Sequence, residues 1–165
     1  MSKAYDDLMT AFAGESRANR KYTAFAKQAD AEGFPQVARL FRAAAEGEAV
    51  HAAAHFKAAN EIKTTKENLE AAIEGEHYEV VEMYPPMIAD AQEEKYAAAT
   101  KSFTRAWNVE KVHEALYKAA LDTLGTQTEV YDYWVCPHCG FVQAKNAPDK
   151  CPVCGHPGSD FFKVV

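Results

Sequence analysis

The sequence contains no long run of apolar residues and no excess of positive charge. Its 165 residues include 18 Lys and Arg against 24 Asp and Glu, which gives a formal net charge of −6. Nucleic acids and anionic membranes attract basic surfaces, so this balance argues against both as partners. The opening stretch MSKAYDDLMTAFAGES lacks the apolar core of a secretory signal, and no segment approaches the roughly 20 apolar residues of a membrane span. We therefore expect a cytoplasmic protein.

Cysteine is absent from the first 135 residues, and all four cysteines lie in the remaining 30. Residues 134–165 also carry four of the seven prolines and three of the eight glycines, whereas alanine, glutamate and lysine dominate before residue 126. This shift predicts two domains, residues 1–130 and residues 131–165. Cytoplasmic thiols are kept reduced, so the cysteines are better interpreted as metal ligands than as disulfides.

The first domain has the periodicity of helices. Apolar residues recur at alternating spacings of three and four, which is one face of an α-helix. Gly33-Phe34-Pro35 separates the first two predicted helices, and Thr64 with Glu67 has the spacing of a capping box that opens the third. Pro85-Pro86 is expected to kink or break that third helix. With a fourth helix to follow, the pattern predicts an all-α four-helix bundle.

The bundle sequence is an internal repeat. LMTAFAGE at 8–15 aligns with LEAAIEGE at 69–76 at an offset of 61, and Glu48-x-x-His51 aligns with Glu110-x-x-His113 at an offset of 62. Two copies of one helical hairpin predict a site with approximate two-fold symmetry between the copies.

The repeated residues are of metal-binding types. Residues at i and i+3 on a helix point the same way, so each Glu-x-x-His motif offers a carboxylate and an imidazole to one point. One Glu from each of two helices plus Glu-x-x-His from each of two others is a di-iron or di-manganese pattern. A single such motif is usually a solvated face, but these glutamates lie on the apolar stripe, where burial without a cation is costly. The predicted ligands are Glu15, Glu48, His51, Glu76, Glu110 and His113.

Three further residues are candidates near this site. Glu79 breaks the repeat because the first copy has Ala18 at that place, so the second copy carries an extra carboxylate, either inward or solvent-facing. Tyr22 and Tyr84 follow Glu15 and Glu76 by seven and eight residues. They either donate hydrogen bonds to ligand carboxylates or are core aromatics.

The cysteines form two C-P-x-C-G knuckles, Cys136-Pro-His-Cys139-Gly and Cys151-Pro-Val-Cys154-Gly. Each knuckle presents two thiolates to one cation, and two knuckles complete a tetrahedral site. Iron and zinc both remain open, because a structural zinc ribbon uses the same ligands.

With these motifs the sequence resembles the rubrerythrins along nearly its whole length. The matching stretches are AFAGES at 11–16, GEHYEVVEMYP at 75–85, the two Glu-x-x-His motifs and the knuckles. The resemblance implies a ferritin-like bundle with two irons and a rubredoxin-like domain of short β-strands and loops with one iron, where zinc can substitute in recombinant protein. It also implies that Glu79 is a seventh ligand, that Glu48 and Glu110 bridge the irons, and that an iron moves between Glu79 and His51 as the redox state changes.

The resemblance further implies a peroxidase that reduces hydrogen peroxide to water and protects against oxidative stress. Electrons would come from rubredoxin or an NAD(P)H-dependent reductase and enter through the cysteine centre. One alternative is a ferroxidase that handles iron like a ferritin, but storage needs neither Glu79 nor an attached one-electron domain. A structural protein with a zinc ribbon is a third interpretation, and it leaves the carboxylate array unexplained.

The link between the hairpins predicts a homodimer with exchanged hairpins. In a ferritin-like arrangement the second and third helices run parallel, so their connection must travel the length of the bundle. About five residues between Asn60 and Thr65 reach roughly 17 Å, whereas a helix of about 25 residues is about 37 Å long. An up-down-up-down bundle within one chain is the alternative. As some rubrerythrins exchange hairpins, we expect Glu15, Glu48 and His51 from one chain to meet Glu76, Glu79, Glu110 and His113 from another.

Overall fold

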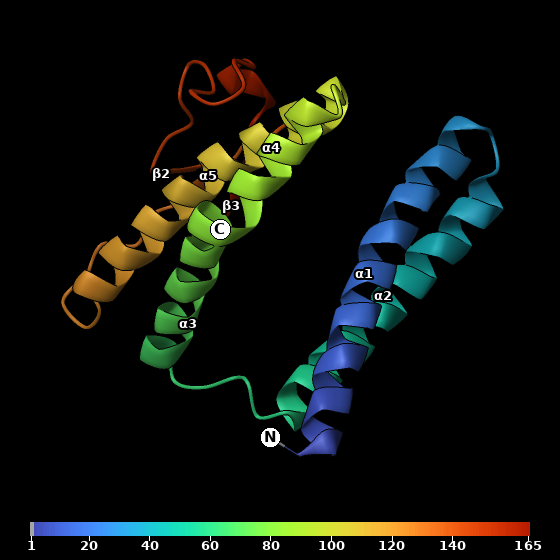
Figure 1. Ribbon diagram of the computed structural model, residues 1–165, viewed down its shortest axis with the longest axis horizontal. Coiled ribbons are helices and arrows are strands. Elements are labelled where there is room, and N and C mark those ends of the chain that lie inside the picture. The colour runs from blue at the N-terminus through green and yellow to red at the C-terminus, as the bar shows by residue number, and fades with distance from the viewer. Residues whose placement is uncertain (1) are drawn as a thin grey trace. The chain divides into compact units, whose positions relative to one another are not determined.

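The computed structural model describes residues 2–165 (Figure 1). The chain divides into two compact units, one ending at Lys63 and the other beginning at Thr64. This division falls in the link between the hairpins. The division into domains at residues 130 and 131 stays a prediction.

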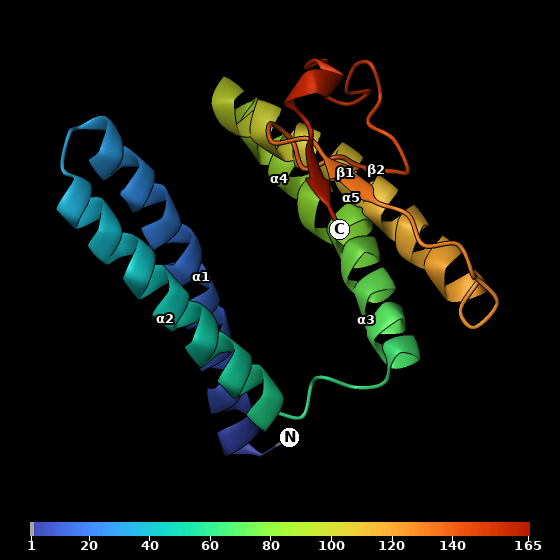
Figure 2. The ribbon, with the colours of Figure 1, turned by 180° about the vertical axis from the view of Figure 1, so that it is seen from behind.

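The first unit is a hairpin of two long helices, α1 (Lys3–Ala31) and α2 (Pro35–Ala58), which lie side by side in both views (Figures 1 and 2). The Ser2 side chain accepts a hydrogen bond from the Tyr5 backbone and caps α1. Gly33 adopts φ +81°, and Pro35 begins α2, where its missing N–H is not needed. The predicted break at Gly33-Phe34-Pro35 is confirmed.

Small side chains let these two helices approach closely. Along α2 the buried residues are Ala38, Ala45 and Ala52, spaced by seven, and α1 buries Ala26 and Ala29. A seven-residue period keeps one seam of a helix against its neighbour. The two backbones come near enough for Asn19 Nδ2 to donate to the Ala45 carbonyl oxygen at 2.7 Å.

The second unit opens with a helix of mixed geometry. It comprises α3 (Thr65–Tyr78), the π-helix η1 (Glu79–Met83) and α4 (Tyr84–Glu93), and after a turn α5 (Ala97–Asp122) packs against all three. Thr64 and Glu67 make both hydrogen bonds of the capping box, as the sequence predicts. The kink or break expected at Pro85-Pro86 takes the form of the π-turn η1, which interrupts the α-helix just before the prolines. Both prolines lie in the first turn of α4, where their missing N–H groups are tolerated.

The π-turn accommodates one inserted residue. Glu15 and Tyr22 are seven apart on the continuous helix α1, whereas Glu76 and Tyr84 are eight apart and η1 lies between them. A single π-turn takes up one extra residue without changing the face that follows. Tyr84 therefore lies on the same face of its helix as Glu76, just as Tyr22 lies on the same face as Glu15. The repeat offset rises from 61 to 62 at this point.

The cysteine-rich segment forms a three-stranded antiparallel sheet with strand order β2-β1-β3. Its strands are β1 (Tyr133–Val135), β2 (Val142–Ala144) and β3 (Phe162–Val164), and a short 3-10 helix, Gly158–Asp160, precedes β3. Its buried Cys136, Phe141, Cys151 and Phe161 pack with Val109 of α5, which is 1% exposed. The segment is thereby fixed to the helix that carries Glu110 and His113.

The predicted fold class, a four-helix-bundle protein with a small C-terminal domain of short strands, is confirmed. No helix among residues 2–165 is long and apolar enough to cross a membrane.

The close seam in the first hairpin gives a stability prediction. We expect Ala45→Leu to lower the free energy of unfolding by about 1–3 kcal/mol, because Ala45 is 4% exposed and a larger side chain would push α1 and α2 apart. Urea denaturation followed by circular dichroism measures the change. Ala43→Leu, an exposed position on the same helix, is the control and should have little effect. Equal stability of the two variants would contradict this packing.

Candidate metal centres

The first hairpin brings three predicted ligands together. Ligand atoms of Glu15, Glu48 and His51 all lie within 4.8 Å of one another. His51 Nδ1 lies 3.0 Å from Glu48 Oε2, and the side chains of His51 and Glu48 are 60% and 21% exposed. The i, i+3 spacing on α2 therefore places imidazole and carboxylate at one point, as expected. We refer to these three residues as the first half-site.

The second unit repeats this arrangement with Glu76 of α3 and Glu110 and His113 of α5. Their ligand atoms also lie within 4.8 Å of one another. His113 Nδ1 is 2.9 Å from Glu110 Oε2 and 3.7 Å from Glu76 Oε1. All three side chains are at least three-quarters covered. We refer to them as the second half-site.

The charges of the second half-site are suited to a cation. Burial, followed by the negative charge of Glu110, raises the pKa of Glu76 to about 7. Half-buried carboxylates that repel one another are costly unless a positive charge compensates them. Carboxylate oxygen with imidazole nitrogen is a donor set for first-row divalent metals such as iron and manganese. The residues present therefore fit the metal centre that the sequence predicts.

Glu79 lies beside this cluster but outside the group within 4.8 Å. Burial raises its pKa, and the charge of Glu110 raises it further, so the Glu79 carboxylate lies within the electrostatic field of the half-site. Glu79 is the first residue of η1. Its predicted role as an additional ligand stays a prediction.

The two predicted tyrosines differ in their surroundings. Burial and the charges of Glu110, Glu79 and Glu76 raise the pKa of Tyr84, so its phenol lies near the carboxylates. Tyr22 packs with its ring 6.3 Å from that of Phe25 and 6.2 Å from that of Phe41. Within the described part of the chain, neither phenol donates a hydrogen bond to a ligand carboxylate.

A network beside the second half-site ties α3 to α5. Glu114 Oε1 lies 3.0 Å from His77 Nδ1 and accepts a hydrogen bond from Lys118 Nζ at 2.6 Å. The hydrogen bond from Lys118 is the main cause that lowers the pKa of Glu114. His77 and Glu114 each follow a half-site residue directly, so this contact fixes how Glu76 and His113 face one another. The pairing of residues 37 apart left no signal in the sequence.

His113 connects the second half-site to the cysteine domain. Its Nε2 lies 3.1 Å from the carbonyl oxygen of Gly140, the residue after Cys139. A carbonyl oxygen only accepts hydrogen bonds, so Nε2 carries the proton, and Nδ1 is directed at the carboxylates. Such a partner fixes the tautomer and ring orientation that a metal-binding histidine requires. The sequence showed both residues but gave no indication that they meet.

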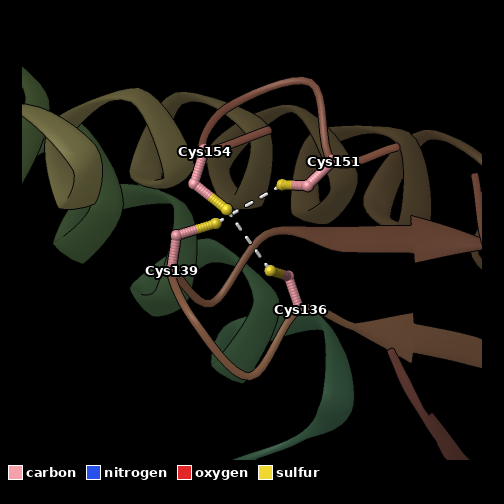
Figure 3. Close-up of side chains that lie close together, drawn as sticks. All are labelled: Cys136, Cys139, Cys151 and Cys154. Atoms are coloured by element: carbon pink, nitrogen blue, oxygen red, sulfur yellow. Dashed lines mark hydrogen bonds between the residues drawn. The ribbon is translucent and has the colours of Figure 1, made fainter. Parts of the chain in front are cut away.

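The four cysteines converge from two loops (Figure 3). The Sγ atoms of Cys136 and Cys154 are 3.6 Å apart, as are those of Cys139 and Cys151. Gly140 and Gly155 adopt φ +84° and +79°, and each donates its N–H to the carbonyl oxygen of the first cysteine of its knuckle. Four sulfurs at these separations suit one tetrahedral ion, iron or zinc.

Two histidines beside the cysteines were not among the predicted site residues. The rings of His138 and His156 stack with centroids 3.6 Å apart, and His138 Nε2 lies 3.1 Å from Asp160 Oδ2. His156 Nδ1 lies 3.3 Å from Cys154 Sγ. The available signals were the positions of His138, inside the first knuckle, and of His156, two residues after Cys154.

Comparison with known proteins agrees with this arrangement. A family model described as rubrerythrin matches residues 6–121, and one described as the rubredoxin-like domain of rubrerythrin matches residues 134–162. The chain is 33% identical to rubrerythrin-1 of Clostridium acetobutylicum over 99% of this chain and 95% of that protein. It is 37% identical to rubrerythrin of Porphyromonas gingivalis over 97% of this chain and 89% of that protein.

Among solved structures, nigerythrin in its fully reduced, all-ferrous state matches with a TM-score of 0.60 and 34% identity. The match covers 99% of this chain and 88% of the nigerythrin chain. The chain therefore belongs to the rubrerythrin family and carries that family's rubredoxin-like domain.

Proposed function

We propose that this protein reduces hydrogen peroxide to water at a di-iron centre that receives electrons through its four-cysteine centre. The reaction consumes one peroxide, two electrons and two protons and releases two waters. Two ferrous ions held by the half-site residues would supply one electron each. The same stoichiometry needs no radical on the protein.

The observation that carries this proposal is the position of His113. Its Nδ1 faces the carboxylates of the second half-site, while its Nε2 donates to the Gly140 carbonyl oxygen at 3.1 Å. Cys139 is bonded directly to Gly140. A path of covalent bonds and one hydrogen bond therefore joins a cysteine ligand to a half-site ligand within one chain. Such a short connection suits the passage of single electrons.

The same contact weighs against the ferroxidase alternative. Iron oxidation and storage would need the carboxylates but no attached one-electron site. Here the buried side chains of the cysteine domain pack on Val109, one residue before the ligand Glu110. A domain held this close to the half-site is better explained by electron delivery, with rubredoxin or an NAD(P)H-dependent reductase as the donor.

A complete di-iron site requires both half-sites, and we propose that two chains supply them by exchange of hairpins. Helix α2 ends at Ala58, and α3 begins at Thr65. The intervening residues 59–64 reach about 20 Å when extended, whereas α2 with its 24 residues is about 36 Å long. A ferritin-like arrangement, in which α2 and α3 run parallel, therefore exceeds the reach of this link within one chain.

Loss of the extra carboxylate should slow turnover. We expect Glu79→Ala to retain both irons but to oxidise more slowly with peroxide, because a carboxylate that would hold iron in the oxidised state is missing. Stopped-flow absorbance measures the rate, and metal analysis checks occupancy. Glu82→Ala removes an exposed carboxylate one turn away and is the matched control. Equal rates for the two variants would refute a role for Glu79.

Damage to the cysteine centre should separate two stages of the reaction. In Cys139→Ser we expect stoichiometric oxidation of the pre-reduced di-iron centre to survive, while steady-state turnover with an external reductase collapses. Protein with zinc in the cysteine site is the control for folding, since zinc keeps tetrahedral ligation but carries no electrons. It should behave like the variant. Normal turnover in either sample would show that electrons enter elsewhere.

Hairpin exchange can be tested by complementation between chains. When Glu48→Ala and Glu110→Ala chains are mixed and refolded together, an exchanged heterodimer contains one intact site and one doubly altered site. Random pairing should restore about a quarter of the wild-type di-iron sites. A mixture of Glu15→Ala and Glu48→Ala chains, which alter the same half-site, is the control and should restore none. If the first mixture also restores none, each site is built from a single chain.

A further inference from the structure

Two prolines follow the π-turn at Glu79–Met83 and deprive backbone carbonyls of their donors, among them the Val80 carbonyl. The Tyr84 N–H donates to the Glu79 carbonyl oxygen, in the i to i+5 register of a π-helix. The Val80 carbonyl would need the N–H of residue 85 in this register. Residue 85 is proline, which has no N–H. An orphaned carbonyl in a partly buried helix is costly unless another group donates to it.

The side chain of Trp107 supplies that donor. Its indole Nε1 donates to the Val80 carbonyl oxygen at 2.8 Å, across from α5 to η1. The Lys111 ammonium lies 3.0 Å from the centroid of the indole ring. A cation over the ring face holds the ring in place by a cation–π interaction. Trp107 is thus fixed from one side by Lys111 and bound to η1 on the other.

The first copy of the repeat provides an internal comparison. At the repeat offset of 62, Trp107 corresponds to Ala45. The first copy has a continuous helix, α1, with no inserted residue between Glu15 and Tyr22, and it has no indole. The large indole donor therefore occurs only in the copy that contains the π-turn.

We propose that Trp107 is a positioning residue that holds the π-turn and, through it, Glu79 and Tyr84 beside the second half-site. Glu79 is the first residue of η1 and Tyr84 directly follows η1. The charges of the second half-site raise the pKa of both side chains, so the turn determines where two groups close to the half-site lie. Trp107 lies one turn before Glu110 on α5, so its hydrogen bond to Val80 also fixes the position of η1 relative to α5. The effect of Trp107 on peroxide turnover rests on the proposed function, whereas its effect on the turn does not.

The test uses Trp107→Phe, which keeps an aromatic ring for Lys111 but removes the N–H. Hydrogen exchange of residues 79–84 in the full, iron-loaded protein reports directly on the turn. We expect exchange of the Tyr84 amide to rise about fivefold or more when the supporting hydrogen bond is lost. Trp134→Phe is the matched control, because that indole donates to the Lys145 carbonyl oxygen in the cysteine domain. It should leave this exchange unchanged.

Rescue separates this role from general destabilisation. Pro85→Ala restores an N–H that can donate to the Val80 carbonyl, so Trp107→Phe in the Pro85→Ala background should exchange like Pro85→Ala alone. If Trp107→Phe by itself folds poorly, the comparison within the Pro85→Ala background still tests the role of the Trp107 N–H. Unchanged exchange in Trp107→Phe, or an equal increase with and without Pro85→Ala, would overturn the proposal.

Turnover distinguishes the proposal from the function on which it draws. Peroxide oxidation in Trp107→Phe should be slowed toward the rate of Glu79→Ala, and Pro85→Ala should restore it. If exchange responds as expected but the wild-type protein does not react with peroxide, the positioning role of Trp107 stands and the proposed function fails.

Discussion

The second unit is organised around the mutual repulsion of partly buried carboxylates that α3, η1 and α5 bring together. Glu76, Glu79 and Glu110 lie close enough that burial and neighbouring charge raise the pKa of Glu76 and of Glu79. Such a cluster is compatible with a stable fold when cations neutralise it and nearby groups hold it in place. The surrounding structure supplies the groups that hold the carboxylates in place. Glu114 joins α3 to α5, Trp107 joins η1 to α5, and Gly140 orients His113.

This arrangement joins the second half-site and the four-cysteine site in one unit. The cysteine knuckles fold against α5, and the same helix presents Glu110 and His113 to the carboxylates. His113 faces both centres, one through each ring nitrogen. Within the described residues of the first unit, His51 Nδ1 contacts Glu48, and no backbone carbonyl there orients the other nitrogen of its ring. The two copies of the repeat have thus diverged, and the second carries the extra carboxylate, the π-turn and the link to the cysteines.

Much of this architecture could be predicted from local sequence. Periodicity gave the helices, the Thr64 and Glu67 spacing gave a helix start, and the Glu-x-x-His motifs and knuckles gave three groups of ligand-type residues that the structure brings together. Pro85-Pro86 indicated a kink or break, but the sequence did not show its form: the inserted residue makes a π-turn, and the helix continues because proline is tolerated in a first helical turn. The contacts of Trp107 with Val80 and of His113 with Gly140 each join residues 27 apart. Such tertiary pairs have no periodic or spacing signal.

We propose that electrons from the cysteine centre reach peroxide through the di-iron site. This route is tested most directly by following the visible absorbance of a pre-reduced iron–cysteine centre after mixing with hydrogen peroxide. In wild-type protein we expect rapid reoxidation, and in Glu110→Ala protein, with its di-iron site disrupted and its cysteine centre intact, we expect the centre to stay reduced. Reoxidation at the same rate in both proteins would contradict the account, as would a wild-type centre that peroxide leaves reduced.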